Sequence, residues 1–233
     1  MKILLVSATK FEIEPLLKSF KKVRAGKNLS TYSSGKHMVD VLITGIGMTA
    51  TAFHLGKILH KKYDLAINVG VAGSFKKNIA LGVVVNVVSD RFGDLGAEDG
   101  QRFLTLDEMG FKEVDPPAGR AGSRKSTRLP DGQEVKSQKI RRVLSGILKV
   151  KGITVNTVHG NTSSIKKIVQ KFNPNIESME GAAFFFACDH EKIPCIQIRG
   201  ISNYVERRNK KNWELDLAVK NLCSSLEYFL KNI

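Results

Sequence analysis

The sequence predicts an α/β protein built as a three-layer αβα sandwich around a mixed central sheet. Apolar runs of strand length alternate with longer stretches in which apolar residues recur at helical spacing, the pattern of a layered α/β domain. Two of the apolar runs are joined by Gly35-Lys36, a short turn typical of a hairpin. Because strands joined through helices are usually parallel and hairpin strands are antiparallel, the expected sheet is mixed.

Strands are expected where apolar and β-branched residues form runs bounded by turn residues. The first run begins at the second residue, two further runs flank the Gly35-Lys36 turn, and the last precedes an amide-containing turn. In chain order the expected strands are Lys2–Ser7, Leu29–Ser34, Met38–Thr44, Leu65–Gly70, Gly82–Asp90, Ile153–Val158 and Cys195–Ser202.

Helices are expected in the amphipathic stretches between these runs, where apolar residues return every three or four positions. The fifth of them is rich in small and aromatic residues, and the sixth is the longest. In chain order the expected helices are Phe11–Lys22, Thr49–Lys61, Val135–Lys149, Ser163–Phe172, Glu180–Glu191 and Lys211–Leu230.

Residues 93–132 interrupt the alternation. They hold three of the six prolines, several glycines and a basic tract from Gly119 to Arg128. A long segment without regular structure is either functional, such as a lid, or disordered, and the sequence leaves both readings open. Neither flank is expected to form a complete core alone. Residues 1–233 are therefore expected to form a single domain with a long loop insertion at about 93–132.

Composition excludes several classes of protein. Hydrophobic residues make up 42% of the 233 positions, which is enough for a full core. The net charge of +15 is spread along the chain and accompanies no helix-turn-helix, zinc finger or aromatic-interleaved motif. We therefore expect solvated surface charge that also attracts anionic substrates, and no nucleic-acid partner.

The chain also lacks targeting and metal-binding patterns. The first apolar run is too short for a signal peptide, and no apolar stretch approaches the roughly 18 residues of a membrane span. The cysteines, Cys188, Cys195 and Cys223, are odd in number and lie in apolar or amphipathic surroundings. We expect reduced thiols in a cytoplasmic protein without a membrane partner. The five histidines show no ligand spacing, so no metal and no other cofactor is expected.

Several polar or small residues follow expected strands or open expected helices: Glu12, Gly73, Gly160, Glu180 and Asn203. Each has an ordinary structural explanation, because glutamates complement helix N-termini and glycines and amides form turns. Their joint placement favours a second explanation. In α/β proteins, polar groups at strand ends collect in the crevice where ligands bind. The pattern therefore predicts a catalytic crevice.

Other polar residues near strand ends leave two interpretations open. Arg199 is either part of the site or an ordinary partner of a nearby carboxylate. His159, which follows the sixth expected strand, is more often structural than catalytic at such a position. Gly45-Ile46-Gly47 lacks the third glycine of a dinucleotide fingerprint, and the chain contains no P-loop. A nucleotide cofactor is therefore not expected.

The chain resembles the superfamily of purine nucleoside phosphorylases and nucleosidases. The resemblance is carried, in order and spacing, by Glu12, Gly45-Ile46-Gly47, Gly70-Val71-Ala72-Gly73, Ser178-Met179-Glu180-Gly181-Ala182-Ala183 and Arg199-Gly200-Ile201-Ser202-Asn203. It covers nearly the whole chain except residues 93–132 and implies the nucleoside phosphorylase fold. Within the superfamily the chain is most similar to the futalosine hydrolases, through residues 156–160 and 198–209, Trp213 and residues 218–222.

The resemblance implies roles for matching residues. Glu12 would hold and deprotonate an attacking water, and Asn203 would contact the departing base. The implied substrate-binding residues are Ala72, Gly73, Thr162, Ser163, Met179, Glu180, Arg199 and Ser202. The implied substrate is a purine nucleoside, the implied assembly is a homodimer or larger homo-oligomer, and Phe92, Phe103, Arg207, Arg208 and the arginines of the insertion are candidates for contact with a 5′-substituent.

Asn203 carries the expected base preference. Adenine-cleaving members of the superfamily carry aspartate at this position, and aspartate can protonate N7. An asparagine amide can instead donate to a 6-oxo group while its carbonyl accepts from N7–H. Asn203 therefore favours hypoxanthine over adenine. The alternatives are a methylthioadenosine, S-adenosylhomocysteine or aminofutalosine nucleosidase, a phosphorylase, a nucleic-acid-binding module and a non-catalytic receptor.

Overall fold

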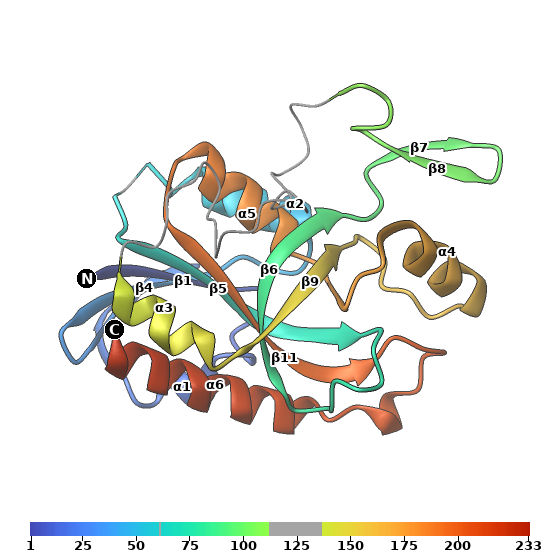
Figure 1. The fold of residues 1–233 in the computed structure, drawn as a ribbon. Helices are drawn as coiled ribbons and strands as arrows, with labels where there is room; N and C mark the ends of the chain where they lie inside the picture. Colours follow the sequence, from blue (N-terminus) through green and yellow to red (C-terminus); the bar gives the residue numbers. More distant parts are fainter. Residues whose placement is uncertain (61, 112–136) are drawn as a thin grey trace.

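A computed structural model of the chain describes residues 1–60, 62–111 and 137–233 (Figure 1). Within these ranges the main sheet contains nine strands in the order β10-β9-β6-β11-β5-β1-β4-β3-β2. Their bounds are β1 Lys2–Ser7, β2 Lys21–Arg24, β3 Leu29–Ser34, β4 His37–Ile43, β5 Leu65–Ser74, β6 Val84–Phe92, β9 Leu148–Thr154, β10 Ile176–Ser178 and β11 Cys195–Tyr204.

The sheet is mixed, as predicted. Strand β1 lies parallel to β4 and β5, and β5 lies parallel to β11, whereas β11 and β6 are antiparallel. The predicted hairpin joins β3 and β4, with Ser34 opposite His37. Gly35 has a φ of 55°, a left-handed conformation that favours glycine in such a tight turn.

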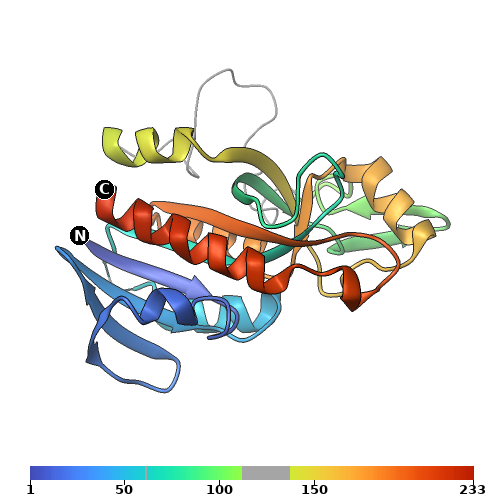
Figure 2. The same ribbon diagram turned by 90° about the horizontal axis from the view of Figure 1, so that it is seen from below.

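Helices cover both faces of the sheet, which confirms the three-layer architecture (Figures 1 and 2). Helices α2 (Met48–Gly56) and α5 (Gly181–His190) pack together on one face. Helices α1 (Glu14–Leu17), α3 (Gln138–Ser145) and α6 (Leu215–Asn232) lie on the other, and α6 contacts β5, β6 and β11. Helix α4 (Thr162–Phe172) follows β9 at one end of the sheet.

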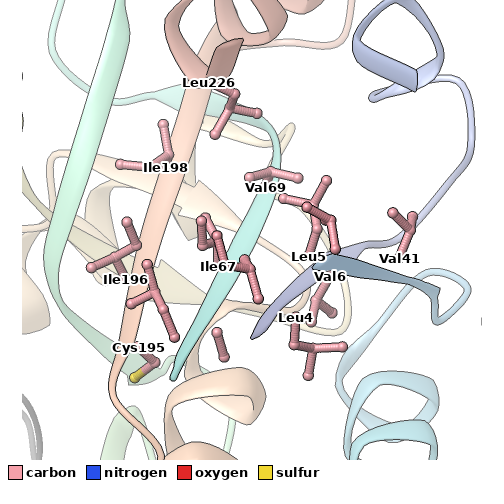
Figure 3. Packing of buried hydrophobic residues seen from close by; sticks show 14 of the residues in the cluster. Leu4, Leu5, Val6, Val41, Ile67, Val69, Cys195, Ile196, Ile198 and Leu226 are labelled. Atoms are coloured by element: carbon pink, nitrogen blue, oxygen red, sulfur yellow. The ribbon is translucent and has the colours of Figure 1, made fainter. Parts of the chain in front are cut away.

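Side chains of the central strands form most of the core (Figure 3). Leu4, Leu5, Ile67 and Val69 are fully buried, and Leu226 of α6 packs over the same region. Burying one such aliphatic side chain contributes about 1.5–3 kcal/mol. The apolar runs are continuous rather than alternating because these strands have helices on both faces. The rigid sheet fixes the positions of the polar residues at its strand ends.

Two predicted elements near the N-terminus and the middle of the chain were wrong in extent. The helix expected over Phe11–Lys22 is only the short α1, and Lys21–Arg24 forms the edge strand β2 beside β3. Pairing with β3 here outweighs the helical spacing of a polar segment. Strand β9 begins at Leu148, where a helix was expected, because Val150 is buried against β6.

The first part of the expected insertion contains regular structure. Strands β7 (Gly96–Asp99) and β8 (Arg102–Thr105) form a separate two-stranded hairpin. The Phe103 ring lies 6.3 Å from the Phe172 ring of α4, so the hairpin packs against that helix. Residues 112–132, with the basic tract, lie outside the described residues. The single domain stays a prediction.

Candidate active site

A cavity of about 400 Å³ opens at the carboxyl ends of β1, β5, β10 and β11. This is the edge of the sheet at which α/β proteins bind ligands. Its wall includes the ends of these strands, the segment before α4 and the segment before α6. The lining residues with polar or aromatic side chains include Thr9, Glu12, His159, Glu177, Glu180, Ser202, Asn203, Arg207, Arg208 and Trp213.

Glu12 lies on this wall with its carboxylate held by four hydrogen bonds. Oε2 accepts from Ser7 Oγ at 3.1 Å and from the backbone N–H and hydroxyl of Thr9, each at 3.0 Å. Oε1 accepts from the Val71 backbone N–H at 3.1 Å. The side chain is buried, so these donors replace water. The carboxylate is therefore fixed in one orientation, with Oε1 the less crowded oxygen.

Glu180 is the second carboxylate of the cavity. It is the N-cap residue of α5, and Oε1 accepts a hydrogen bond from the Gly47 backbone N–H at 3.0 Å. Burial raises the pKa of Glu180, while Arg199 and the Gly47 N–H oppose this effect and the charge of Glu12 adds to it. The two glutamates are thus close enough to interact, and a cation placed between them would be favoured.

Arg199 lies behind the wall and does not line the cavity. It is 1% exposed; its Nε donates to Gln197 Oε1 at 3.1 Å, and its Nη2 donates to Asn68 Oδ1. Gly70 lies between Arg199 and Glu12. A Cβ on Gly70 would be 2.6 Å from Glu12 Oε1 and 2.8 Å from Arg199 Nη1. Glycine at this position allows the guanidinium and the carboxylate to share one small space.

A chain of buried side chains extends from Arg199 across the sheet. Gln197 Nε2 donates to Asp90 Oδ2 at 3.0 Å, and the Thr154 hydroxyl donates to Asp90 Oδ1 at 2.9 Å. Thr154 also accepts from the Ala182 backbone N–H at the start of α5, at 2.8 Å. Burial raises the pKa of Asp90 to about 6 despite these hydrogen bonds and the charge of Arg199. The network ties Arg199 to the helix that carries Glu180.

Asn203 lines the cavity at an irregularity in β11. The ladder between β11 and β5 shifts between Ile201 and Asn203, so that Asn203 pairs with Gly73. Ser202 Oγ donates to Asn203 Oδ1 at 2.8 Å, and Asn203 Nδ2 donates to the Tyr204 carbonyl at 3.0 Å. These bonds fix the amide. One N–H and one lone pair remain for a ligand.

His159 and Glu177 form an ion-pair geometry that sequence reasoning missed. His159 Nδ1 lies 2.7 Å from Glu177 Oε2, and the His159 backbone N–H donates to Oε1 at 3.0 Å. Both residues line the cavity, and Glu177 is 4% exposed on its side chain. The sequence offered one signal for this pair: polar residues at 156–160, close to the end of an expected strand, and a glutamate before Ser178. Nothing in the sequence paired them.

Arg207, Arg208 and Trp213, which precede α6, form an aromatic and cationic wall of the cavity. The Arg208 guanidinium lies 5.0 Å from the centre of the Trp213 ring, and Arg207 lines the cavity beside them. Glu206 is paired outside with Lys77 Nζ at 2.5 Å, and this contact lowers the pKa of Glu206. With Glu206 neutralised in this way, the wall has an overall positive character.

Comparison with known proteins identifies the family to which the chain belongs. The sequence profile described as "Phosphorylase superfamily" matches residues 2–231. The chain belongs to this family. The superfamily resemblance predicted from Met179-Glu180 and the residues around Asn203 is therefore confirmed.

Among relatives in this superfamily, the chain is similar to a futalosine hydrolase of Streptomyces coelicolor, with 25% identity over 195 residues that cover 80% of this chain and 76% of the relative. It is 27% identical over 191 residues to a futalosine hydrolase of Thermus thermophilus, covering 81% of this chain and 80% of the relative.

Solved structures of the Phosphorylase superfamily share the fold. A 5′-methylthioadenosine/S-adenosylhomocysteine nucleosidase from Colwellia psychrerythraea, in complex with adenine, matches with a TM-score of 0.77 and 19% identity, covering 100% of this chain and 95% of that one. The native futalosine hydrolase of Helicobacter pylori matches with a TM-score of 0.75 and 16% identity, covering 100% and 98%.

The structure brings together most, but not all, of the site residues predicted from the superfamily resemblance. The predicted residues that line the cavity are Glu12, Ala72, Gly73, Met179, Glu180, Ser202 and Asn203. Arg199 lies behind it. Thr162 and Ser163 are exposed at the start of α4, where the Ser163 N–H bonds the Asn161 side chain, and the structure does not bring them to the cavity. Val158, His159 and Gly160 occupy that part of the wall.

Three further observations bear on metals, membranes and thiols. In the parts of the chain that the structure describes, His, Cys, Asp and Glu side chains form no group of three or more that could hold a metal ion. None of the helices in those parts is both long and apolar enough to cross a membrane. The thiols of Cys188, Cys195 and Cys223 are free and buried.

Proposed function

We propose that this chain is a purine nucleosidase of the futalosine hydrolase type. It hydrolyses the N-glycosidic bond of futalosine, releasing hypoxanthine and dehypoxanthine futalosine, a step of menaquinone biosynthesis. The observation that carries this proposal is the convergence of Glu12, Glu180 and Asn203 on one cavity of about 400 Å³. The similarity to futalosine hydrolases over about four fifths of the chain supports the same substrate.

The two glutamates suit the sugar end of the reaction. Cleavage of the bond to N9 develops positive charge on C1′ and O4′, which nearby carboxylates stabilise. Glu180 is oriented by the Gly47 N–H and binds the ribose hydroxyls, with Met179 as the apolar floor. This arrangement selects a ribose but does not determine which base is bound.

Glu12 activates the water that attacks C1′. Its Oε2 is occupied by three donors, whereas Oε1 accepts one hydrogen bond among the described residues, from the Val71 N–H, and retains a lone pair. A water bound to Oε1 transfers its proton to the carboxylate as the C1′–O bond forms. General-base assistance of this kind contributes about 10²–10⁴-fold. The reaction needs no cofactor.

Asn203 suits a 6-oxopurine. The fixed amide retains one N–H to donate to the 6-oxo oxygen and one lone pair to accept from N7–H. A 6-amino group would place two donors against each other. Sites built around paired groups reject such mismatched substrates by about 10⁴-fold or more. Hypoxanthine nucleosides are therefore preferred to adenine nucleosides.

The aromatic and cationic wall suits the 5′-substituent. Futalosine ends in a benzoate, which needs an apolar surface and a cation. Trp213 offers the surface, and Arg208 is already stacked on it, so its guanidinium loses little freedom when it binds a carboxylate. We assign Arg208 to this carboxylate and Arg207 to general attraction of the anion.

We also propose a homodimer in the cytoplasm. Helices α2 and α5 pack together, and the region around them exposes Ile46 (63%), Phe53 (57%) and Phe186 (36%). Grouped exposed apolar side chains favour an interface. Because Ile46 also lines the cavity, a partner subunit on this face would contribute to its rim. Sedimentation velocity tests the assembly, and a monomer at micromolar concentration would exclude it.

One experiment separates this function from its alternatives. Free base is measured by chromatography after incubation with futalosine, aminofutalosine, inosine and methylthioadenosine, each with and without phosphate. We expect hypoxanthine from futalosine without phosphate. Faster adenine release would indicate a methylthioadenosine or aminofutalosine nucleosidase, and ribose 1-phosphate would indicate a phosphorylase. Substituting Asn203→Asp should shift the preference toward the 6-amino substrates.

A further inference from the structure

The proposed chemistry lacks a proton donor for the departing base. When the C1′–N9 bond breaks, its electron pair remains on the purine, which must gain a proton to leave as neutral hypoxanthine. Asn203 can orient the base through hydrogen bonds, but an amide transfers no proton at neutral pH. A second group in the cavity is needed for this step.

The pair His159 and Glu177 lies on the other side of the cavity floor from Asn203. In the sheet, Glu177 of β10 pairs with Gly73 of β5, and Gly73 pairs with Asn203 of β11. Glu177, Gly73 and Asn203 therefore occupy one row across three adjacent strands. Strands lie about 4.8 Å apart, so the row spans roughly 10 Å, which accommodates a flat purine between the Asn203 amide and Glu177, the residue that holds the imidazole.

Gly73 leaves the middle of this row open. A Cβ at Gly73 would be 3.1 Å from Asn203 Nδ2 and 3.0 Å from Val205 Cγ2. A side chain there would crowd the amide and fill the middle of the row between Asn203 and Glu177. The glycine therefore keeps the two polar groups accessible to the same ligand.

The hydrogen bonds of His159 fix the orientation of its ring at the cavity wall. Nδ1 is held by Glu177 Oε2 at 2.7 Å, and within the described ranges no hydrogen-bond partner is found for Nε2. The bond from the His159 backbone N–H to the same glutamate, at 3.0 Å, would by itself be enough to hold the loop against β10. The second bond fixes the ring, as a carboxylate does for a catalytic histidine. The Phe75 ring, 6.4 Å from the imidazole, packs beside it.

We propose that His159 is the general acid that protonates the leaving purine, and that Glu177 is its positioning residue. This inference rests on the proposed nucleosidase function. The C1′–N9 bond breaks and its electron pair moves into the purine; a ring nitrogen of the base takes the proton from His159 Nε2. Water forms the new C1′–O bond and gives its proton to Glu12. Solvent returns this proton to the imidazole, so that the net reaction consumes one water.

The test compares two leaving groups. Nitrophenyl riboside releases nitrophenolate, which is a stable anion near neutral pH and needs no proton, whereas a purine does. For His159→Gln we expect kcat on futalosine or inosine to fall by about 10²–10⁴-fold, the usual contribution of a general acid, with KM changed far less. Cleavage of nitrophenyl riboside should fall by less than about tenfold, since no proton transfer is lost.

Glu177→Gln gives a second readout through the orientation of the ring. It should reduce kcat on the nucleosides more than on nitrophenyl riboside, because the imidazole loses its fixed orientation but remains present. His54→Gln is the matched control: His54 lies in α2, outside the residues that line the cavity, and its Nε2 lies 3.2 Å from Asn28 Nδ2. This control should cleave both substrates like the wild type. Thermal unfolding of all variants verifies that each is folded.

The outcomes separate the inference from the function on which it rests. Equal losses on both substrates, or unchanged nucleoside hydrolysis in His159→Gln, would overturn the general-acid role while the nucleosidase function stands. A folded Glu177→Gln with wild-type kcat would overturn the positioning role. If the wild type cleaves none of the nucleosides, the proposed function itself fails, and the inference fails with it.

Discussion

Substituting Gly70→Ala tests how tightly the active-site carboxylate is held. The new methyl would be 2.6 Å from Glu12 Oε1, whereas ordinary van der Waals contact begins at 3.4 Å. The carboxylate must therefore move by roughly 0.8 Å. Arg199 Nη1, at 2.8 Å from the same point, prevents the methyl from turning aside. A displacement of about 1 Å in an active site costs about 10²-fold in rate, and we expect a loss of this size in kcat.

The assay for Gly70→Ala measures kcat and KM on futalosine together with urea unfolding. Gly56→Ala is the matched control, because a Cβ there meets nothing within 4 Å and Gly56 ends α2. A glycine-to-alanine change at a compatible site stabilises by about 0.4–1 kcal/mol, so Gly56→Ala should be active and slightly more stable. If Gly70→Ala retained wild-type kcat, Glu12 would not be the fixed general base that the hydrogen bonds indicate.

Other predictions concern the buried network around Asp90, the cavity wall and the hydrogen bonds that orient Glu12. Burial raises the pKa of Asp90 from an ordinary 3.8 to about 6, so its neutral form favours folding and the associated stability is lost as pH rises between these values. The unfolding free energy of Asp90→Asn should lack this dependence, so the variant should gain about 2 kcal/mol relative to wild type between pH 4 and pH 7, whatever the difference between the two proteins at pH 4. The same change of unfolding free energy with pH in both proteins, measured by urea unfolding, would contradict this. Arg208→Ala should raise KM for futalosine at least tenfold while leaving inosine nearly unchanged, a carboxylate contact being worth about 1.5–3 kcal/mol; equal changes on both substrates would exclude the contact. Thr9→Val removes one hydroxyl donor to Glu12 and should lower kcat by about fivefold, a loss of about 1 kcal/mol in the orientation of the carboxylate; an unchanged kcat would show that the remaining three donors suffice.

Much of the fold could be predicted because it depends on local pattern. The strands at Lys2–Ser7 and Leu29–Ser34 match the predicted bounds, since each is a run bounded by turn residues. Strand β2 and the three-residue β10 could not be predicted in this way. Both are short segments that become strands only through pairing with neighbours distant in the chain or across a turn.

The site shows the same division. Glu12, Glu180 and Asn203 were predictable because each follows a strand or opens a helix, and the topology brings strand ends together. The pairing of His159 with Glu177 depends on the register of β10, which no local pattern reveals. Thr162 and Ser163 were placed by resemblance alone; here the helix begins with an Asn161 cap, and neither Thr162 nor Ser163 is among the residues that line the cavity.

The most direct test of the central claim is hypoxanthine release from futalosine in phosphate-free buffer by the wild type and Glu12→Gln. We expect stoichiometric hypoxanthine and dehypoxanthine futalosine from the wild type, and a kcat lower by about 10²–10⁴-fold in the variant because the general base is lost. No base release by the wild type, release only on addition of phosphate, or a Glu12→Gln variant as fast as the wild type would contradict it.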